Sequence, residues 1–214
     1  MLHIRSFRFS VLPAAVLGAV MLLAGAVRGE PLPAGLVEQL RAGGQVIVFR
    51  HGATVAAAAK VDSMSRPNVP AQRQLNDEGR AQAKAIGEAL RKLKIPVAQV
   101  LTSTVQRAVD TGRLFGLGEV ATTGDLAESG QESSAEDNER RAQALRKLVA
   151  TAPPAGGNVV LVSHKPNLVD AFGAGWSDVR EGEASVFQPD GKGGTRLVAR
   201  VPAAAWTELA AEAH

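Results

Sequence analysis

The sequence contains no cysteine among its 214 residues. Disulfide bonds, a cysteine nucleophile, thiolate metal sites and a lipid anchor on cysteine are therefore excluded. The chain also lacks a strong excess of one charge, because 24 lysines and arginines stand against 21 aspartates and glutamates. Two of the basic residues, Arg5 and Arg8, lie at the N-terminus, so the chain from residue 27 onward is nearly neutral. This balance argues against nucleic-acid binding by the folded part.

A hydrophobic run long enough to span a membrane is not found near the N-terminus either. The apolar stretch Val11–Ala26 has 16 residues and contains Pro13, whereas a membrane-spanning helix needs about 20 apolar residues. The stretch follows two arginines and ends in the small residues Ala24-Gly25-Ala26, a layout typical of a secretory signal peptide. We therefore expect a signal peptide over 1–26, a folded domain over 27–214, a periplasmic or secreted location, and no stable membrane insertion after the leader is removed.

Apolar segments of strand length alternate with segments of helical pattern beyond residue 35. The predicted strands are Gln45–Phe49, Val97–Leu101 and Asn158–Val162. The predicted helices are Leu36–Arg41, a helix capped by Asn76 and ended before Pro96, Val105–Phe115, and a helix opened by the capping box Ser133-Ser134-Ala135-Glu136. Ala184–Phe187 and Thr195–Val201 are expected to pair across a turn at Asp190-Gly191. This alternation predicts an α/β fold, a three-layer α/β/α sandwich with a mainly parallel central sheet.

Two histidines occupy equivalent places in this pattern. Arg50-His51-Gly52 directly follows the first predicted strand, and Ser163-His164 follows the third. In an open α/β sheet, ligands bind just past the carboxyl ends of strands. The glycine allows a sharp turn and close approach, and an arginine beside a histidine suits a phosphate. The two histidines together favour a shared anion site over two separate, hydrogen-bonded surface histidines.

Arg107 adds a cation after the second predicted strand. It lies in the first turns of the helix predicted over Val105–Phe115, where the helix N-terminus already favours anions. The alternative is a solvated helix arginine that pairs with Asp110.

Four segments in this order resemble a known family. They are Arg50-His51-Gly52, Leu75-x-x-x-Gly79-x-x-Gln82-Ala83, Ser103-x-x-x-Arg107-Ala108-x-x-Thr111 and Ser163-His164. Together they resemble the small branch of the histidine phosphatase superfamily, which has the phosphoglycerate-mutase-like fold. The resemblance covers roughly residues 45–170.

The resemblance implies a mechanism for these residues. His51 would attack phosphorus and become a phosphohistidine, while Arg50, Arg107 and His164 would hold the phosphoryl oxygens. Gly52 and Lys165 are the further expected substrate contacts, although Lys165 could instead face solvent. The family pattern implies no metal or other cofactor, because arginines and histidines supply the positive charge.

The general acid that protonates the leaving oxygen is the least determined residue. The family often places a glutamate in a Leu-x-Glu segment after the second strand–helix unit, and Leu126-Ala127-Glu128 fits that spacing. Glu128 is therefore the expected acid, with Glu132 or Glu183 as alternatives. An ordinary loop carboxylate at position 128 remains an equal interpretation.

Departures from the family pattern narrow the function. Many sugar-phosphate members carry a glutamate after the glycine and an asparagine shortly beyond, where this chain has Ala53 and Ala57. A mutase is therefore disfavoured. The residue after the second histidine is often glycine, whereas here Lys165 and Pro166 follow.

Two hypotheses of different classes remain. The first is a secreted, metal-independent phosphatase for a small-molecule or glycan phosphate. The second is a non-catalytic phosphate- or phosphoglycan-binding module that retains the pocket. Loop residues 53–73 and the stretch 170–183, with Phe172 and Trp176, are expected to shape specificity.

Overall fold

A computed structural model describes residues 31–55, 69–130 and 133–213. The predicted signal peptide, residues 1–26, lies outside these ranges, as do Ala57 and Glu132. One compact unit comprises Leu32–His214. In the described parts of the chain, no helix is both long and apolar enough to cross a membrane.

A six-stranded mixed sheet forms the centre of this unit, in the order β3-β2-β4-β1-β5-β6. The strands are β1 (Val46–Arg50), β2 (Val97–Ser103), β3 (Val120–Thr123), β4 (Asn158–Ser163), β5 (Ala184–Pro189) and β6 (Thr195–Val201). Neighbouring strands from β3 to β1 run parallel, whereas β5 and β6 add an antiparallel edge. The predicted sandwich with a mainly parallel sheet is confirmed.

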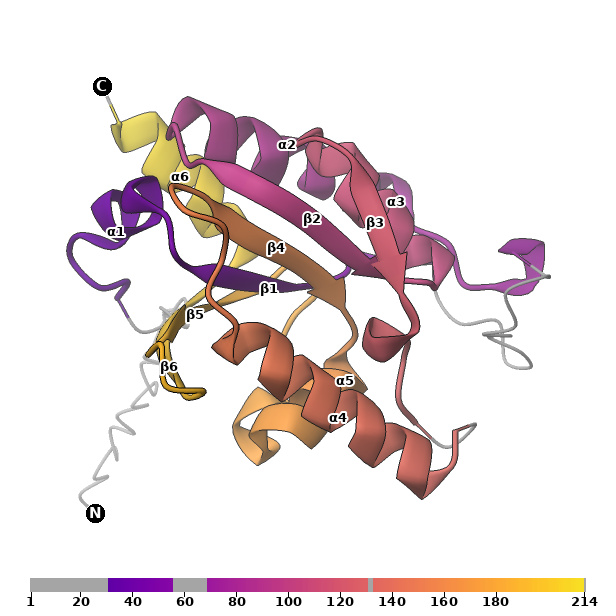
Figure 1. The fold of residues 1–214 in the computed structure, drawn as a ribbon. Coiled ribbons are helices and arrows are strands. Elements are labelled where there is room, and N and C mark those ends of the chain that lie inside the picture. Colours follow the sequence, from indigo (N-terminus) through magenta and orange to yellow (C-terminus); the bar gives the residue numbers. More distant parts are fainter. Residues whose placement is uncertain (1–30, 56–68, 131–132, 214) are drawn as a thin grey trace, which may run out of the picture. The chain divides into compact units, whose positions relative to one another are not determined.

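Helices cover both faces of the sheet. They are α1 (Leu36–Ala42), α2 (Asp77–Lys92), α3 (Gln106–Phe115), α4 (Ala135–Ala150), α5 (Lys165–Phe172) and α6 (Ala203–Glu212). Figure 1 shows α2, α3 and α6 on one face and α4 and α5 on the other.

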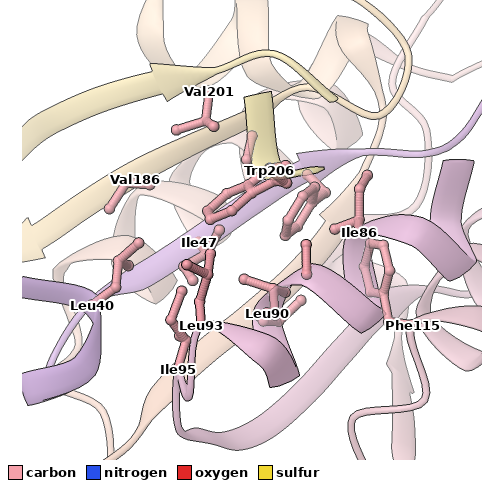
Figure 2. Close-up of a cluster of buried hydrophobic side chains, with 14 of the residues drawn as sticks. Leu40, Ile47, Ile86, Leu90, Leu93, Ile95, Phe115, Val186, Val201 and Trp206 are labelled. Carbon is pink, nitrogen blue, oxygen red and sulfur yellow. The ribbon is translucent and has the colours of Figure 1, made fainter. Parts of the chain in front are cut away.

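Each face of the sheet has its own hydrophobic core. Ile47 and Phe49 of β1 contribute to the core under α2, α3 and α6, where Trp206 is fully buried (Figure 2). Val46 and Val48 point to the opposite core, under α4 and α5. This alternation follows from the two-residue period of a strand. A strand covered on both faces has no polar positions, which explains the continuous apolar run that the sequence shows here.

Side-chain caps fix where two helices begin. The Asn76 side chain accepts a hydrogen bond from Gly79 N at 2.7 Å, as its predicted N-cap position requires. At α4 the cap is Ser134, which accepts from Asp137 N at 3.0 Å. The capping pair therefore lies one residue later than the Ser133–Glu136 pair of the predicted box.

Among the strands and α-helices of the described residues, three were not predicted. Strand β3 has four residues at the edge of the sheet and alternates little between apolar and polar. Helix α5 begins directly after His164, where the sequence analysis placed only a site residue, and α6 is rich in alanine. Phe172 and Trp176 pack against Phe187 of β5, with ring centroids 4.7 and 6.4 Å away. Both rings thus contribute to the second core.

Candidate active site

The parallel pairing of β1 with β4 brings the two histidines together. Arg50 and Ser163 are partners in the register, so the residues that follow them leave the sheet at the same level. The imidazole rings of His51 and His164 have centroids 5.2 Å apart. Their residues are 1% and 0% exposed. The two rings therefore share one buried site at the carboxyl edge of the sheet.

One nitrogen of His51 is held by its own loop. Nδ1 lies 2.8 Å from the carbonyl oxygen of Gly52, which can only accept a hydrogen bond. Nδ1 therefore carries the proton, and Nε2 keeps its lone pair. Burial, followed by the positive charge of Arg107, lowers the pKa of His51 from 6.5 to about 3. The ring is thus neutral at ordinary pH, as a nucleophile must be.

His164 is also buried and neutral. Its Nε2 lies 2.8 Å from Ser103 Oγ, at the end of β2. Its Nδ1 faces the Glu128 carboxylate at 3.8 Å. Burial, and then the neighbouring His51, hold the pKa of His164 well below its usual value. This histidine therefore offers its surroundings a hydrogen bond and not a full charge.

Arg107 is the second residue of α3, and its positive charge contributes to the lowered pKa values of both histidines. It is fully buried and forms an ion pair with Glu128. Asp110 accepts a hydrogen bond from Gln106 Nε2 at 2.7 Å. The alternative of a solvated arginine at position 107 is wrong, because Arg107 is fully buried.

Arg50 is anchored by the segment that precedes β5. Its Nη1 donates to Val179 O at 2.8 Å, and Nη2 contacts Glu181 Oε1 at 3.2 Å. The same carboxylate oxygen accepts from Thr54 Oγ1 at 3.1 Å. Burial lowers the pKa of Arg50. Glu181 was missed by the sequence analysis, because its partner lies 131 residues away.

Arg73 is a further cation at this site that the sequence analysis missed. Its positive charge contributes to the lowered pKa values of His51 and His164. Its loop is fixed on both sides: Val55 N donates to Gln74 O at 3.1 Å, and Gln106 N donates to the Gln72 side chain at 2.7 Å. In the sequence, only its position two residues before Leu75 of the second motif segment could have indicated that Arg73 belongs to the site.

The remaining motif residues hold the His51 loop in place. Gly52 N donates to Thr111 Oγ1 at 3.0 Å, and Thr111 donates in turn to Arg107 O at 2.7 Å. Gly79 packs against the loop so closely that a Cβ there would overlap the carbonyl oxygen of Ala53. These contacts fix the His51 loop relative to Arg107.

Comparison with known proteins identifies this arrangement. The family model of the histidine phosphatase superfamily (branch 1) matches residues 46–130, a span that holds three of the four motif segments. Over these residues the chain is similar to the histidine phosphatase superfamily. The match supports a phosphatase and leaves its substrate unspecified. No curated protein matches the sequence.

Solved structures share the fold of this chain. The protein histidine phosphatase SixA complexed with tungstate has a TM-score of 0.54 at 18% identity, covering 75% of this chain and 98% of its own. The putative phosphohistidine phosphatase SixA from Agrobacterium tumefaciens gives 0.52 at 18%, with coverages of 74% and 97%. A mycobacterial glucosyl-3-phosphoglycerate phosphatase complexed with VO3 gives 0.53 at 19%, with coverages of 72% and 97%.

The three candidate acids of the site differ in their placement. Glu128 contacts Arg107 and lies beside His164, and 15% of its side chain is exposed. Glu183 accepts from Arg200 Nε at 2.7 Å and from Arg180 N at 3.1 Å, which ties its carboxylate to groups other than the histidines. Glu132 lies outside the described residues. Of the two acids that are described, Glu128 is the one in the site.

Lys165 is the first residue of α5, directly after His164, and is partly buried.

Over the described ranges, no group of three or more histidines and carboxylates gathers closely enough to hold a metal ion.

Proposed function

We propose that this chain is a metal-independent phosphatase that hydrolyses phosphate monoesters through a phosphohistidine on His51. The observation that carries the proposal is the hydrogen bond from His51 Nδ1 to Gly52 O. This bond leaves Nε2 with a free lone pair on a ring that is neutral by virtue of its lowered pKa. A neutral, oriented imidazole at a buried cationic site is what nucleophilic attack on phosphorus requires.

The surrounding charges suit the transferred phosphoryl group. Catalysis of phosphoryl transfer consists mainly of positioning the group and stabilising its negative oxygens. Arg107 supplies a fully buried positive charge, and Arg50 supplies a largely buried one. His164 supplies a neutral hydrogen-bond donor. Arg73 adds to the positive potential felt by both histidines. In this proposal Gly52 offers close backbone approach, and Lys165 can reach the part of the substrate beyond the phosphoryl group.

Glu128 is the proposed general acid. Without a ligand, its carboxylate neutralises Arg107. A phosphoryl oxygen that binds Arg107 would displace this carboxylate toward the leaving oxygen, where Glu128 takes up the proton of the monoanionic phosphate ester. His51 Nε2 then forms the bond to phosphorus, the ester P–O bond breaks, and the leaving oxygen takes a proton from Glu128. Water afterwards gives a proton to Glu128 and attacks the phosphohistidine, which releases inorganic phosphate and restores His51.

The substrate and location are proposed more broadly. The predicted signal peptide supports a periplasmic or secreted enzyme. Structural relatives include a protein histidine phosphatase and a glucosyl-3-phosphoglycerate phosphatase, so phosphohistidine and sugar phosphates are the first candidates to test. The Glu128–Arg107 pair also favours one alternative, a phosphate-binding module whose acid is permanently bound to Arg107.

Turnover of 4-nitrophenyl phosphate in the presence of EDTA tests the proposal. The wild-type protein should hydrolyse the ester, and His51→Ala should abolish hydrolysis. Asp125→Asn, which removes an exposed ion pair with Arg140, should leave the rate unchanged. Phosphate binding without turnover over a panel of sugar phosphates, nucleotides, lipopolysaccharide-core phosphates and phosphohistidine would support the binding module instead.

A further inference from the structure

Ser103 is a motif residue for which the mechanism above has no use. It ends β2, is fully buried, and places its Oγ 2.8 Å from His164 Nε2. The same Oγ accepts a hydrogen bond from Val105 N at 3.1 Å. The hydroxyl proton therefore remains to be placed, and the position of that proton determines the tautomer of His164.

The neighbours of His164 favour one of its two neutral tautomers. If Nε2 carried the proton, it would donate to Ser103, and the Ser103 hydroxyl proton would be buried without an acceptor. Nδ1 would then turn a lone pair toward the Glu128 carboxylate, 3.8 Å away. If Nδ1 carries the proton, Ser103 donates to Nε2 and the Nδ1–H points at the carboxylate. The second arrangement gives the buried Ser103 hydroxyl an acceptor, and an unsatisfied buried hydroxyl costs about 1–3 kcal/mol. It also turns the Nδ1–H, which makes no hydrogen bond within the protein, toward the carboxylate and so leaves it available to a ligand.

We propose that Ser103 is a positioning residue that holds His164 in its Nδ1–H tautomer. Its hydroxyl occupies Nε2, so that the other end of the ring presents an N–H to the phosphoryl group. The inference rests on the proposed function only for the identity of that ligand.

The two histidines then carry the proton on the same nitrogen but face the site with opposite ends. His51 donates its Nδ1–H to Gly52 O and turns its Nε2 lone pair to the phosphorus. His164 accepts a hydrogen bond from the Ser103 hydroxyl at Nε2 and turns its Nδ1–H to a phosphoryl oxygen. The two rings have centroids 5.2 Å apart and thus combine a nucleophile with a neutral hydrogen-bond donor. The carbonyl oxygen of Gly52 sets the role of His51, and the hydroxyl oxygen of Ser103 sets the role of His164.

The proton positions can be read directly from ¹⁵N-histidine NMR spectra at pH 7. Signals are assigned with His51→Ala and His164→Ala. His164 should show a protonated Nδ1 and a hydrogen-bonded, unprotonated Nε2. In Ser103→Ala the ring should lose this preference and shift toward a mixture of tautomers, whereas Ser103→Thr should retain it. Thr102→Val is the matched control, because the Thr102 hydroxyl is also buried but bonds to the Ser103 carbonyl.

Turnover gives an independent readout. Ser103→Ala should lower kcat/KM for 4-nitrophenyl phosphate and weaken vanadate binding, each by roughly tenfold, while Thr102→Val should not. A wild-type spectrum with the proton on Nε2 of His164, or an unchanged spectrum in Ser103→Ala, would overturn the inference even if the enzyme is active. The Nδ1–H tautomer in a protein that hydrolyses no phosphate ester would instead overturn the proposed function and leave the assignment of Ser103 intact.

Discussion

Glu128→Gln should have three effects of different sign, because Glu128 is both the partner of Arg107 and the proposed acid. The substitution keeps the shape of the side chain and removes its charge. Removal of one partner from a fully buried ion pair costs about 3–5 kcal/mol. The Glu128 side chain is 15% exposed, and the amide oxygen can still accept a bond from Arg107. We therefore expect a loss of about 2 kcal/mol in the free energy of unfolding, measured by urea denaturation.

Anion binding should become stronger in the same variant. The carboxylate competes with a phosphoryl oxygen for Arg107 in the wild-type protein, and this competition is absent in Glu128→Gln. With an effective dielectric constant of about 20, two charges 4 Å apart interact by at most about 4 kcal/mol. A tenfold increase in vanadate affinity corresponds to about 1.4 kcal/mol, which is well within this bound. Calorimetric titration with vanadate measures it.

Turnover should fall in a way that depends on the leaving group. Loss of a general acid lowers the rate by about 10²–10⁴-fold when the leaving oxygen needs a proton. The decrease should therefore be large for a sugar phosphate and much smaller for 4-nitrophenyl phosphate. Glu183→Gln provides the control, because its carboxylate is likewise largely buried against an arginine, Arg200. It should cost stability without changing the leaving-group dependence. Equal rates of sugar phosphate hydrolysis in wild type and Glu128→Gln would refute the assignment of the acid.

Three further changes test other parts of the site. The pKa of His51 is about 3 in the folded state and near 6.5 in the unfolded state. The contribution of His51 to the free energy of unfolding should therefore be complete above pH 6.5 and be lost as the pH falls toward 3. Urea midpoints from pH 7 to pH 4 measure this loss, and a His51 ring that titrates near pH 6.5 by NMR would contradict the prediction. Gly79→Ala should cost about 2 kcal/mol of stability through overlap with Ala53, whereas Gly124→Ala, with open space around it, should unfold at the same urea concentration as wild type. Arg73→Met should raise the pKa of His51 and weaken vanadate binding several-fold, and unchanged values of both would remove Arg73 from the site.

The sequence contained enough information to predict the elements that carry the site. Val46–Phe49 and Asn158–Val162 are continuous apolar runs, and such runs indicate strands that are covered on both faces. Their parallel pairing then places His51 beside His164. Arg107 could be placed because the helical pattern that begins at Val105 determines which turn it occupies. These predictions depended on local pattern and on the rules of parallel sheets.

The partners of the charged groups could not be predicted in the same way. Arg50 meets Glu181 across 131 residues, and Glu128 meets Arg107 across 21. No local pattern encodes such pairs, since they depend on how the segments before β5 and after η2 (Gly124–Leu126) cross the sheet edge. Arg73 was missed for the same reason, because its loop has no periodicity. Strand β3 was missed because an exposed edge strand needs few apolar residues.

The covalent state of His51 during turnover tests the central claim most directly. The protein is mixed with phosphoramidate or a sugar phosphate for milliseconds, quenched in alkali and digested, and the peptide that contains His51 is analysed by mass spectrometry. The account predicts one phosphoryl group on the imidazole of His51, stable in alkali and lost in acid, and none in His51→Ala. Turnover that proceeds with no phosphoryl group on His51 at any time point would contradict it.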